Sequence, residues 1–397
     1  MPMDAAGRAA CLSQFFLSSW RCYPKLTLTR YALCSKSKAY GENLSTRIDS
    51  ILDSWLQVAV KPGIEELTLF LYEDEEYIFP ISLLSLGVRS SIRSLELRSC
   101  VFRPTPELGP LRGLTRLALR DVRITGLKLE CLLFNSLALE LLDLIHCHRI
   151  IFLKIPSVLL QLSCVKVRGC SYLRAVENKA PNLSSFTLYG QVSKLSLGAT
   201  LPMMKVFVMR CDKVIRYARA NLPPIMPNLK TLELGSTFEV NTPMLPSKFL
   251  NLKHLIIQVN GETLSPSYDY FSLISFLDAS PSLETWWLDV RHFFEGSSHL
   301  RQLPECHHDR LKSFEVIGFS SAKGLVELTC CIVKRGNNSD CQDAMCRAIR
   351  TAELEEASRA VVAIRRYIED KVPSTAKLTL VEPCPCRRCR STHMDDE

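Results

Sequence analysis

The sequence lacks any long uninterrupted run of apolar residues. Apolar stretches such as residues 131–134 and 158–160 fall far short of the ~18–20 residues needed to cross a bilayer. The first residues include Asp4 and Arg8 and do not contain the continuous apolar core of a signal peptide. We therefore expect an intracellular protein, in the cytoplasm or the nucleus, without a membrane partner.

Signatures of enzymes and of nucleic-acid binding are also missing. No two of the 16 glycines lie two residues apart, which excludes a Gly-x-Gly-x-x-Gly nucleotide loop, and no Gly-Lys-Ser/Thr or His-Glu-x-x-His motif occurs. The net charge of +8, from 49 Lys and Arg against 41 Asp and Glu, is spread over 397 residues, whereas nucleic-acid binding is typical of a concentrated basic stripe. We expect a protein that is not an enzyme, needs no cofactor and has no nucleic-acid partner.

Cysteine is abundant, with 17 residues. In an intracellular protein we expect reduced thiols, because the cytosol and the nucleus keep disulfides open. One cluster has metal-like character: Cys384, Cys386 and Cys389, followed by His393. Four such ligands could close a tetrahedral zinc site, yet Cys-x-x-Cys pairs on both sides are absent. We favour a cysteine-rich tail over residues 382–397 without a metal, and zinc is the alternative.

A recurring pattern organises most of the chain. The 61 leucines recur in a frame of an apolar anchor, a second apolar residue three positions later and a third two positions after that, often followed by Cys. Ile92, Leu95, Leu97 and Cys100 give the complete frame. Successive anchors lie 20–31 residues apart, mostly within the range of about 20–29 that is typical of leucine-rich repeats. The eleven anchors are Ile64, Ile92, Leu114, Leu139, Leu162, Leu183, Met203, Leu229, Leu252, Leu283 and Leu311.

Each unit predicts a short strand whose apolar side chains point to one side, with the chain returning behind the sheet. One unit cannot bury its leucines alone, so the units would stack. The sequence predicts an α/β fold: a leucine-rich-repeat solenoid with short parallel strands, with unrelated strands of another α/β fold as the alternative. Four cysteines would share one slot after the strand and pack as small apolar residues; they are Cys100, Cys147, Cys170 and Cys211.

Inserted helices account for the longer spacings. We predict one helix over residues 267–279, a second over 320–332 and an amphipathic third over about 352–370. Residues 377–381 alternate like a strand and could pair after the third helix. Residues 335–381 would then form a C-terminal helical cap with one terminal strand, which the end of a stack of repeats requires.

Three segments resemble the plant F-box proteins with leucine-rich repeats and an FBD-like C-terminal region. Residues 9–21, AACLSQFFLSSWR, are similar to the second half of the F-box of that family. Residues 270–284 and the phrases between 299 and 328 are similar to its later repeats and FBD-like segment. The resemblance divides the chain into a partial F-box with one helix (1–30), a connecting region (31–63), and repeats with an FBD-like end (64–334).

The family resemblance implies a substrate adaptor of an SCF-type ubiquitin ligase, in which the F-box binds a Skp linker protein and the repeats bind the target. The family's F-box opens with a Leu-Pro helix, whereas this chain starts at Met1 about halfway into the motif. We therefore expect weak or lost linker binding, and the alternative function is a protein-binding repeat module without the ligase link. The residues matching the linker-facing part of the motif are Ala10, Cys11, Leu12, Ser13, Phe16 and Trp20.

Outward-facing strand positions predict where a protein target would bind. The residues on either side of the third apolar position of each unit would face the concave side of the sheet, about 4.8 Å from their equivalents in the next unit. Arg, Tyr and Trp are favoured at protein interfaces. The bland alternative is a set of scattered, solvated residues. We predict that an acidic target segment binds Arg98, Arg120, Lys166, Arg168, Tyr189, Phe207 and Trp287.

Overall fold

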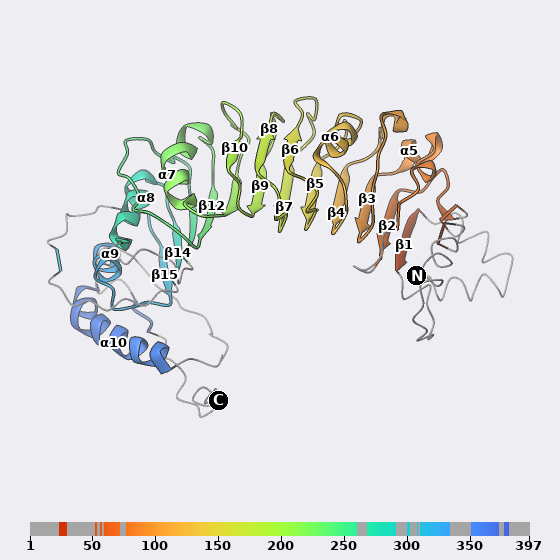
Figure 1. Ribbon diagram of the computed structural model, residues 1–397. Helices are drawn as coiled ribbons and strands as arrows, with labels where there is room; N and C mark the ends of the chain where they lie inside the picture. Colours follow the sequence, from red (N-terminus) through yellow and green to blue (C-terminus); the bar gives the residue numbers. More distant parts are fainter. Residues whose placement is uncertain are drawn as a thin grey trace, which may run out of the picture. The chain divides into compact units, whose positions relative to one another are not determined.

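The computed structural model (Figure 1) describes residues 24–29, 52–53, 56–57, 59–71, 77–259, 268–290, 300–301, 308, 310–333, 351–372 and 377–380. The chain divides into two compact units, Met1–Met203 and Met204–Glu397. Within the described ranges, no helix is both long and apolar enough to cross a membrane. The linker-facing residues 10–20 and the cysteine-rich tail lie outside the described residues.

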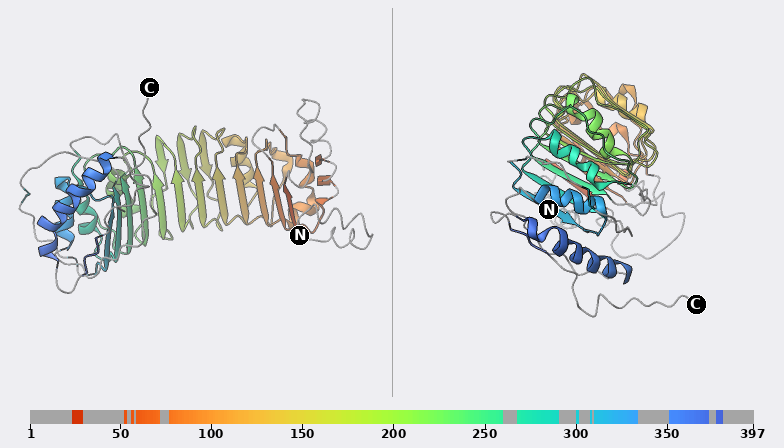
Figure 2. Two further views of the ribbon diagram at one scale, coloured as in Figure 1. Left: turned by 90° about the horizontal axis from the view of Figure 1, so that it is seen from below. Right: turned by 90° about the vertical axis from the view of Figure 1, so that its left-hand side faces the viewer.

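The main sheet of the first unit has one short strand per repeat, and each strand runs parallel to the next (Figure 2). Residues 25–29, which the sequence analysis assigned to the partial F-box, pair with the first predicted repeat instead, because KLTLT has the same alternation as the other strands. In spatial order the strands are β1 (Lys25–Thr29), β2 (Glu66–Phe70), β3 (Ser94–Arg98), β4 (Arg116–Arg120), β5 (Leu141–Ile145), β7 (Cys164–Arg168) and β9 (Ser185–Tyr189).

The second unit repeats this arrangement with its own parallel strands. The strands are in the same order in space as in the chain, so each repeat lies beside the next one. This is an α/β repeat fold, as predicted. The strands are β11 (Val206–Arg210), β12 (Thr231–Ser236), β13 (His254–Val259), β14 (Thr285–Val290) and β15 (Ser313–Ile317).

Alternation along each strand decides what is buried. In β3, Leu95 and Leu97 are completely buried, whereas Glu96 and Arg98 between and after them are half-buried on the opposite face. The anchor Ile92 and the slot residue Cys100 are buried as well. The predicted inward positions are confirmed in this repeat. Stacked in parallel, these side chains form a continuous apolar core, and its burial is the main stabilising contribution to the fold.

The segments that connect the strands of the first unit's main sheet lie on the side of the buried leucines, opposite the face with the half-buried polar residues (Figure 1). Three of them form a second parallel sheet, in the order β10–β8–β6, which the sequence analysis did not predict. Gly126 allows a helix to approach this sheet closely, because a Cβ there would lie 2.2 Å from the carbonyl oxygen of Phe152. The elements are η1 (Ile81–Leu83), α5 (Leu86–Ser91), η2 (Pro106–Leu108), α6 (Gly126–Phe134), β6 (Phe152–Ile155), β8 (Ala175–Asn178) and β10 (Lys194–Ser196).

Longer helices replace these strands in the second unit. The buried carboxylate of Glu239 accepts hydrogen bonds from the backbone N–H of Ile215 (2.9 Å) and of Arg216 (3.4 Å), and so caps the start of α7. Burial raises the pKa of the Glu239 carboxyl. The helices are α7 (Val214–Ile225), η3 (Tyr270–Leu273), α8 (Ile274–Ala279), α9 (Lys323–Val333), α10 (Thr351–Tyr367) and η4 (Glu369–Lys371).

All three predicted helices are present, and the predicted terminal strand is not. The helix over 267–279 is the continuous run of η3 and α8, capped by Asp269, whose side chain accepts from Phe271 N. Residues 377–380 have no strand pairing. Leu378 packs instead against the apolar cluster where α9 meets α10. Its apolar side chain is partly buried there without strand pairing.

One repeat is shifted by a residue from the prediction. Phe207 was placed on the exposed face, but Phe207 is completely buried and is paired in register with the core residue Leu232. All four residues from Val206 to Met209 are apolar, so alternation alone does not distinguish the two faces, and the larger side chains occupy the core. Cys211 therefore falls one position before the slot of Cys100, not in it.

Most of the described cysteines are free thiols, as predicted. Burial raises the pKa of the Cys100 thiol to about 12, so this residue is a protonated, apolar packing group at neutral pH. Cys331 on α9 is disulfide-bonded. The expectation that every cysteine is a reduced thiol is therefore wrong at this position.

Candidate protein-binding face

The outward side chains of the first unit's main sheet form rows across neighbouring strands, and we call this surface the first-unit face. Each row follows from the parallel register, which places equivalent residues directly side by side. The middle row contains Thr27, Thr68, Glu96, Ala118, Asp143, Lys166 and Thr187, and the row at the strand ends contains Thr29, Phe70, Arg98, Arg120, Ile145, Arg168 and Tyr189.

Two arginines of this face lie opposite each other. Arg98 on β3 and Arg120 on β4 are register partners. Like charges in that arrangement destabilise a sheet, because neighbouring strands are only about 4.8 Å apart. Within the described residues, neither guanidinium has an ion pair or a side-chain hydrogen bond. In the part of the chain that the structure describes, nothing neutralises this pair of positive charges.

Arg116 extends the same positive area and was missed by the sequence analysis. It is exposed on β4, two residues before the small side chain of Ala118 and four before Arg120. The frame used for prediction considered only the two positions around the third apolar residue, so the first outward position of each strand was left out. Lys166, as predicted, is half-buried in the middle row.

Arg168 differs from the other arginines of the row. Its guanidinium donates to both carboxylate oxygens of Asp143 on β5, at 3.2 and 3.1 Å. A paired arginine offers less charge to an acidic partner, so the predicted role of Arg168 is weakened. Tyr189 is its register neighbour at the end of the row and is half-buried, as an aromatic anchor at an interface would be.

The equivalent positions of the second unit, which we call the second-unit face, include an arginine that is already paired. Arg210, which the shifted frame also missed, donates to Glu233 at 2.6 Å. Its stem lies across Gly235, where a Cβ would be 2.9 Å from Arg210 Cγ. The predicted residue Trp287 is half-buried in the middle row here, next to Glu315, and so belongs to a different unit from the arginines.

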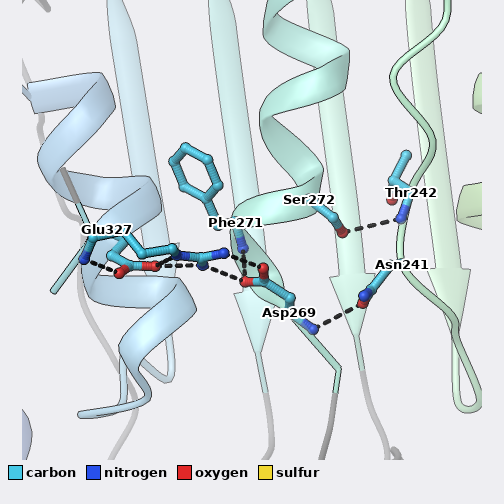
Figure 3. Close-up of polar contacts among 7 residues, drawn as sticks. Asn241, Thr242, Asp269, Phe271, Ser272 and Glu327 are labelled. Atoms are coloured by element: carbon cyan, nitrogen blue, oxygen red, sulfur yellow. Dashed lines mark hydrogen bonds and ion pairs between the residues drawn. The ribbon is translucent and has the colours of Figure 1, made fainter. Parts of the chain in front are cut away.

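A network of charged residues joins the helices of the second unit (Figure 3). Arg301 donates to both oxygens of Asp269, at 2.8 and 3.0 Å, and its Nε donates to the buried Glu327 of α9 at 2.7 Å. The hydrogen bonds to Asp269 and to Glu327 raise the pKa of Arg301. Asp269 N in turn donates to Asn241. These groups satisfy one another, which is the pattern of a structural network.

No candidate metal centre is found among the described residues, where no group of three His, Cys, Asp or Glu side chains could hold an ion. His146 and His148 flank Cys147 where β5 ends, and their rings are stacked with centroids 6.0 Å apart. The predicted alternative of a zinc site at Cys384 to His393 lies outside the described residues and stays a prediction.

Comparison with known protein families gives one match. The family model described as At1g61320/AtMIF1, LRR domain, matches residues 38–385, which is most of the chain. A comparison with curated proteins gives no match. The matched range begins after the segment that resembles an F-box, and it includes every strand described here except β1. The chain therefore belongs to the At1g61320/AtMIF1 leucine-rich-repeat domain family.

Proposed function

We propose that the protein is a non-enzymatic binding protein whose first-unit face holds an acidic segment of a protein target. The observation that carries this proposal is the pair Arg98 and Arg120, which are register neighbours on adjacent strands and have no partner among the described residues. Leucine-rich-repeat domains commonly use such extended surfaces to bind proteins. Exposed Arg116 and half-buried Lys166 extend the positive area, while Tyr189 supplies an aromatic group at its end.

The proposed function includes a link to an SCF-type ubiquitin ligase inside the cell, in the cytoplasm or the nucleus. This part rests on the resemblance of residues 9–21 to an F-box. The linker-facing positions, Ala10 to Ser13 with Phe16 and Trp20, would contact the Skp linker protein. The repeats would stack as a solenoid, closed at one end by the F-box helix and at the other by α10, which packs against α9 through Ile364 and Ile368.

The family match favours a second candidate function, target binding without the ligase. It covers residues 38–385, so it supports the repeats and is silent on the linker-facing segment. A chain that binds a target but no Skp linker would act by holding its target rather than by delivering it for ubiquitination.

Capture of a purified Skp linker by the full chain separates these two functions. The adaptor proposal expects at most weak binding by the chain as it stands, loss of that binding in Phe16→Ala/Trp20→Ala, and restored binding when a Leu-Pro helix is grafted before Asp4. Capture that is undetectable in all three chains would refute the ligase link and leave the target-binding proposal standing. The matched control is Phe134→Ala, an exposed aromatic residue at the end of α6.

A further inference from the structure

A cavity of about 270 Å³ lies where strands β3, β4 and β5 of the first unit end. It is next to the first-unit face, because Ser99 follows Arg98 and Asp121 follows Arg120 in the chain. In parallel sheets, ligands commonly bind at the carboxyl ends of the strands. The polar residues that line it are Ser99, Asp121, Arg123, His146, His148 and Arg149.

The turns that build this cavity share an unusual backbone conformation. Ser99, Asp121 and His146 have φ angles of 55°, 53° and 52°. Residues other than glycine rarely adopt this left-handed backbone conformation, and each one that does stores strain. The backbone N–H of each donates to the end of the next strand, at 2.9, 2.8 and 2.9 Å. Three successive turns are thereby held in one shape, and their side chains are presented along one edge.

His146 lines the cavity and is held in place by two contacts. Its Nδ1 lies 3.2 Å from Asp121 Oδ1. The ring passes over Gly169, where a Cβ would lie 2.2 Å from Cδ2 and 2.6 Å from Nε2 of His146. Glycine is thus required at 169 for the imidazole to occupy this position. The carboxylate of Asp121 thus has the His146 ring as a partner within the lining.

His148 presents a hydrogen-bond donor. Its ring is stacked on that of His146 with an interplanar angle of 6°, and its Nδ1 accepts from the backbone N–H of Ser171 at 3.3 Å. With Nδ1 accepting, the proton of the neutral ring is on Nε2, which can donate to a ligand. Arg123 and Arg149 add two exposed guanidinium groups to the lining.

We infer that this cavity binds the phosphate group of a phosphorylated side chain in the target segment that lies on the first-unit face. Guanidinium groups are suited to phosphate because their planar donors engage two oxygens at once. The volume is large enough for a phosphoserine side chain with adjoining backbone. This inference rests on the proposed function, since the segment that lies over Arg98 and Arg120 would deliver the phosphorylated residue.

Titration calorimetry on the full chain tests this inference independently of any target. The probes are N-acetyl-phosphoserine amide, N-acetyl-aspartate amide and inorganic phosphate. We expect the phosphoserine probe to bind, and Arg149→Gln and His148→Gln each to weaken it by about tenfold or more. Arg112→Gln, which removes an exposed arginine outside the lining, should leave the affinity unchanged. Thermal melting of each variant establishes that it is folded.

Several results would overturn the inference. These are no binding of the phosphoserine probe at millimolar concentration, equal binding of the aspartate probe, or equal losses in Arg112→Gln and Arg149→Gln. Binding of inorganic phosphate alone would also overturn it, because a phosphorylated side chain is the assigned ligand. Target binding that persists while the phosphoserine probe fails would refute this site and leave the proposed function intact.

Discussion

Arg98 and Arg120 in the first unit lie side by side and have no partner among the described residues, whereas Arg210 in the second unit lies over Gly235 and pairs with Glu233. Both units have the same alternating frame and the same buried leucines. Because both units bury the same kind of apolar core, the core does not explain why their outward faces carry different charges. The proposal that the first-unit face binds the target therefore rests on the pair Arg98 and Arg120, which has no partner among the described residues, and not on the core.

Core substitutions should have the largest effects on stability, and these effects should be similar in the two units because both have the same type of apolar core. Leu97→Ala in β3 and Leu234→Ala in β12 each remove a fully buried side chain and should lower the free energy of unfolding by about 2–5 kcal/mol. Arg98→Ala, which changes only the exposed face, should shift it by less than about 0.5 kcal/mol. Denaturant melts of the three variants measure this, and an unchanged melt for Leu97→Ala would contradict the repeat frame.

A smaller effect should be confined to the second unit. The buried Arg219 of α7 donates to the carbonyl oxygens of Ser275 and Ser247, both at 3.0 Å, and to that of Leu245. Arg219→Met keeps much of the volume but leaves these acceptors unpaired, which should cost about 1–3 kcal/mol. Hydrogen exchange should show faster opening in α7 and α8 and no change in β3 and β4. Uniform loss of protection in both units would refute two separable units.

The salt dependence of target affinity should distinguish the two faces, with a smaller effect than the core and Arg219 substitutions. Target binding through unpaired arginines should weaken by about threefold or more when the salt concentration rises from about 50 to 200 mM, because screening shortens the range of exposed charges. The Arg210→Glu chain should keep the same salt dependence, since Arg210 is already paired. A salt-independent affinity would rule out the arginines as the main contact.

The smallest effect concerns the start of the second unit's strands. Lys253 and Lys312 each donate to Glu284 at 2.7 Å and lower the pKa of its carboxyl from 4.5 to about 2. A lowered pKa in the folded state gives stability that is present above pH 4.5 and is lost as the pH falls towards 2. Glu284→Gln should therefore melt slightly lower than the unmodified chain at pH 6, and this difference should vanish near pH 2. A difference that grows on acidification would contradict the ion pairs.

The fold was largely predictable from the sequence because its signal is repeated. Alternation placed Leu95 and Leu97 inward, and 3.6-residue periodicity found the helices that became α8, α9 and α10. The prediction failed where this signal was ambiguous. Four apolar residues in a row hid the register of Phe207, and the short return strands β6, β8 and β10 have too few residues for a pattern.

The candidate site was less predictable, because it depends on pairing between distant residues. Sequence placed Arg98, Arg120 and Arg168 on one row but did not distinguish them. Only the structure shows that Asp143 pairs with Arg168 and that the other two have no partner among the described residues. The turn conformations at Asp121 and His146 likewise have no sequence signature, since left-handed residues are usually glycine.

Charge reversal on the two faces tests the central claim most directly. The purified target is titrated against the Arg98→Glu/Arg120→Glu chain and against the matched Arg210→Glu chain, with melting curves to verify that each is folded. The account predicts a loss of about tenfold or more for the first-unit pair and less than about threefold for Arg210→Glu. Equal affinities for both chains, or a larger loss with Arg210→Glu, would contradict the assignment of the first-unit face as the target-binding surface.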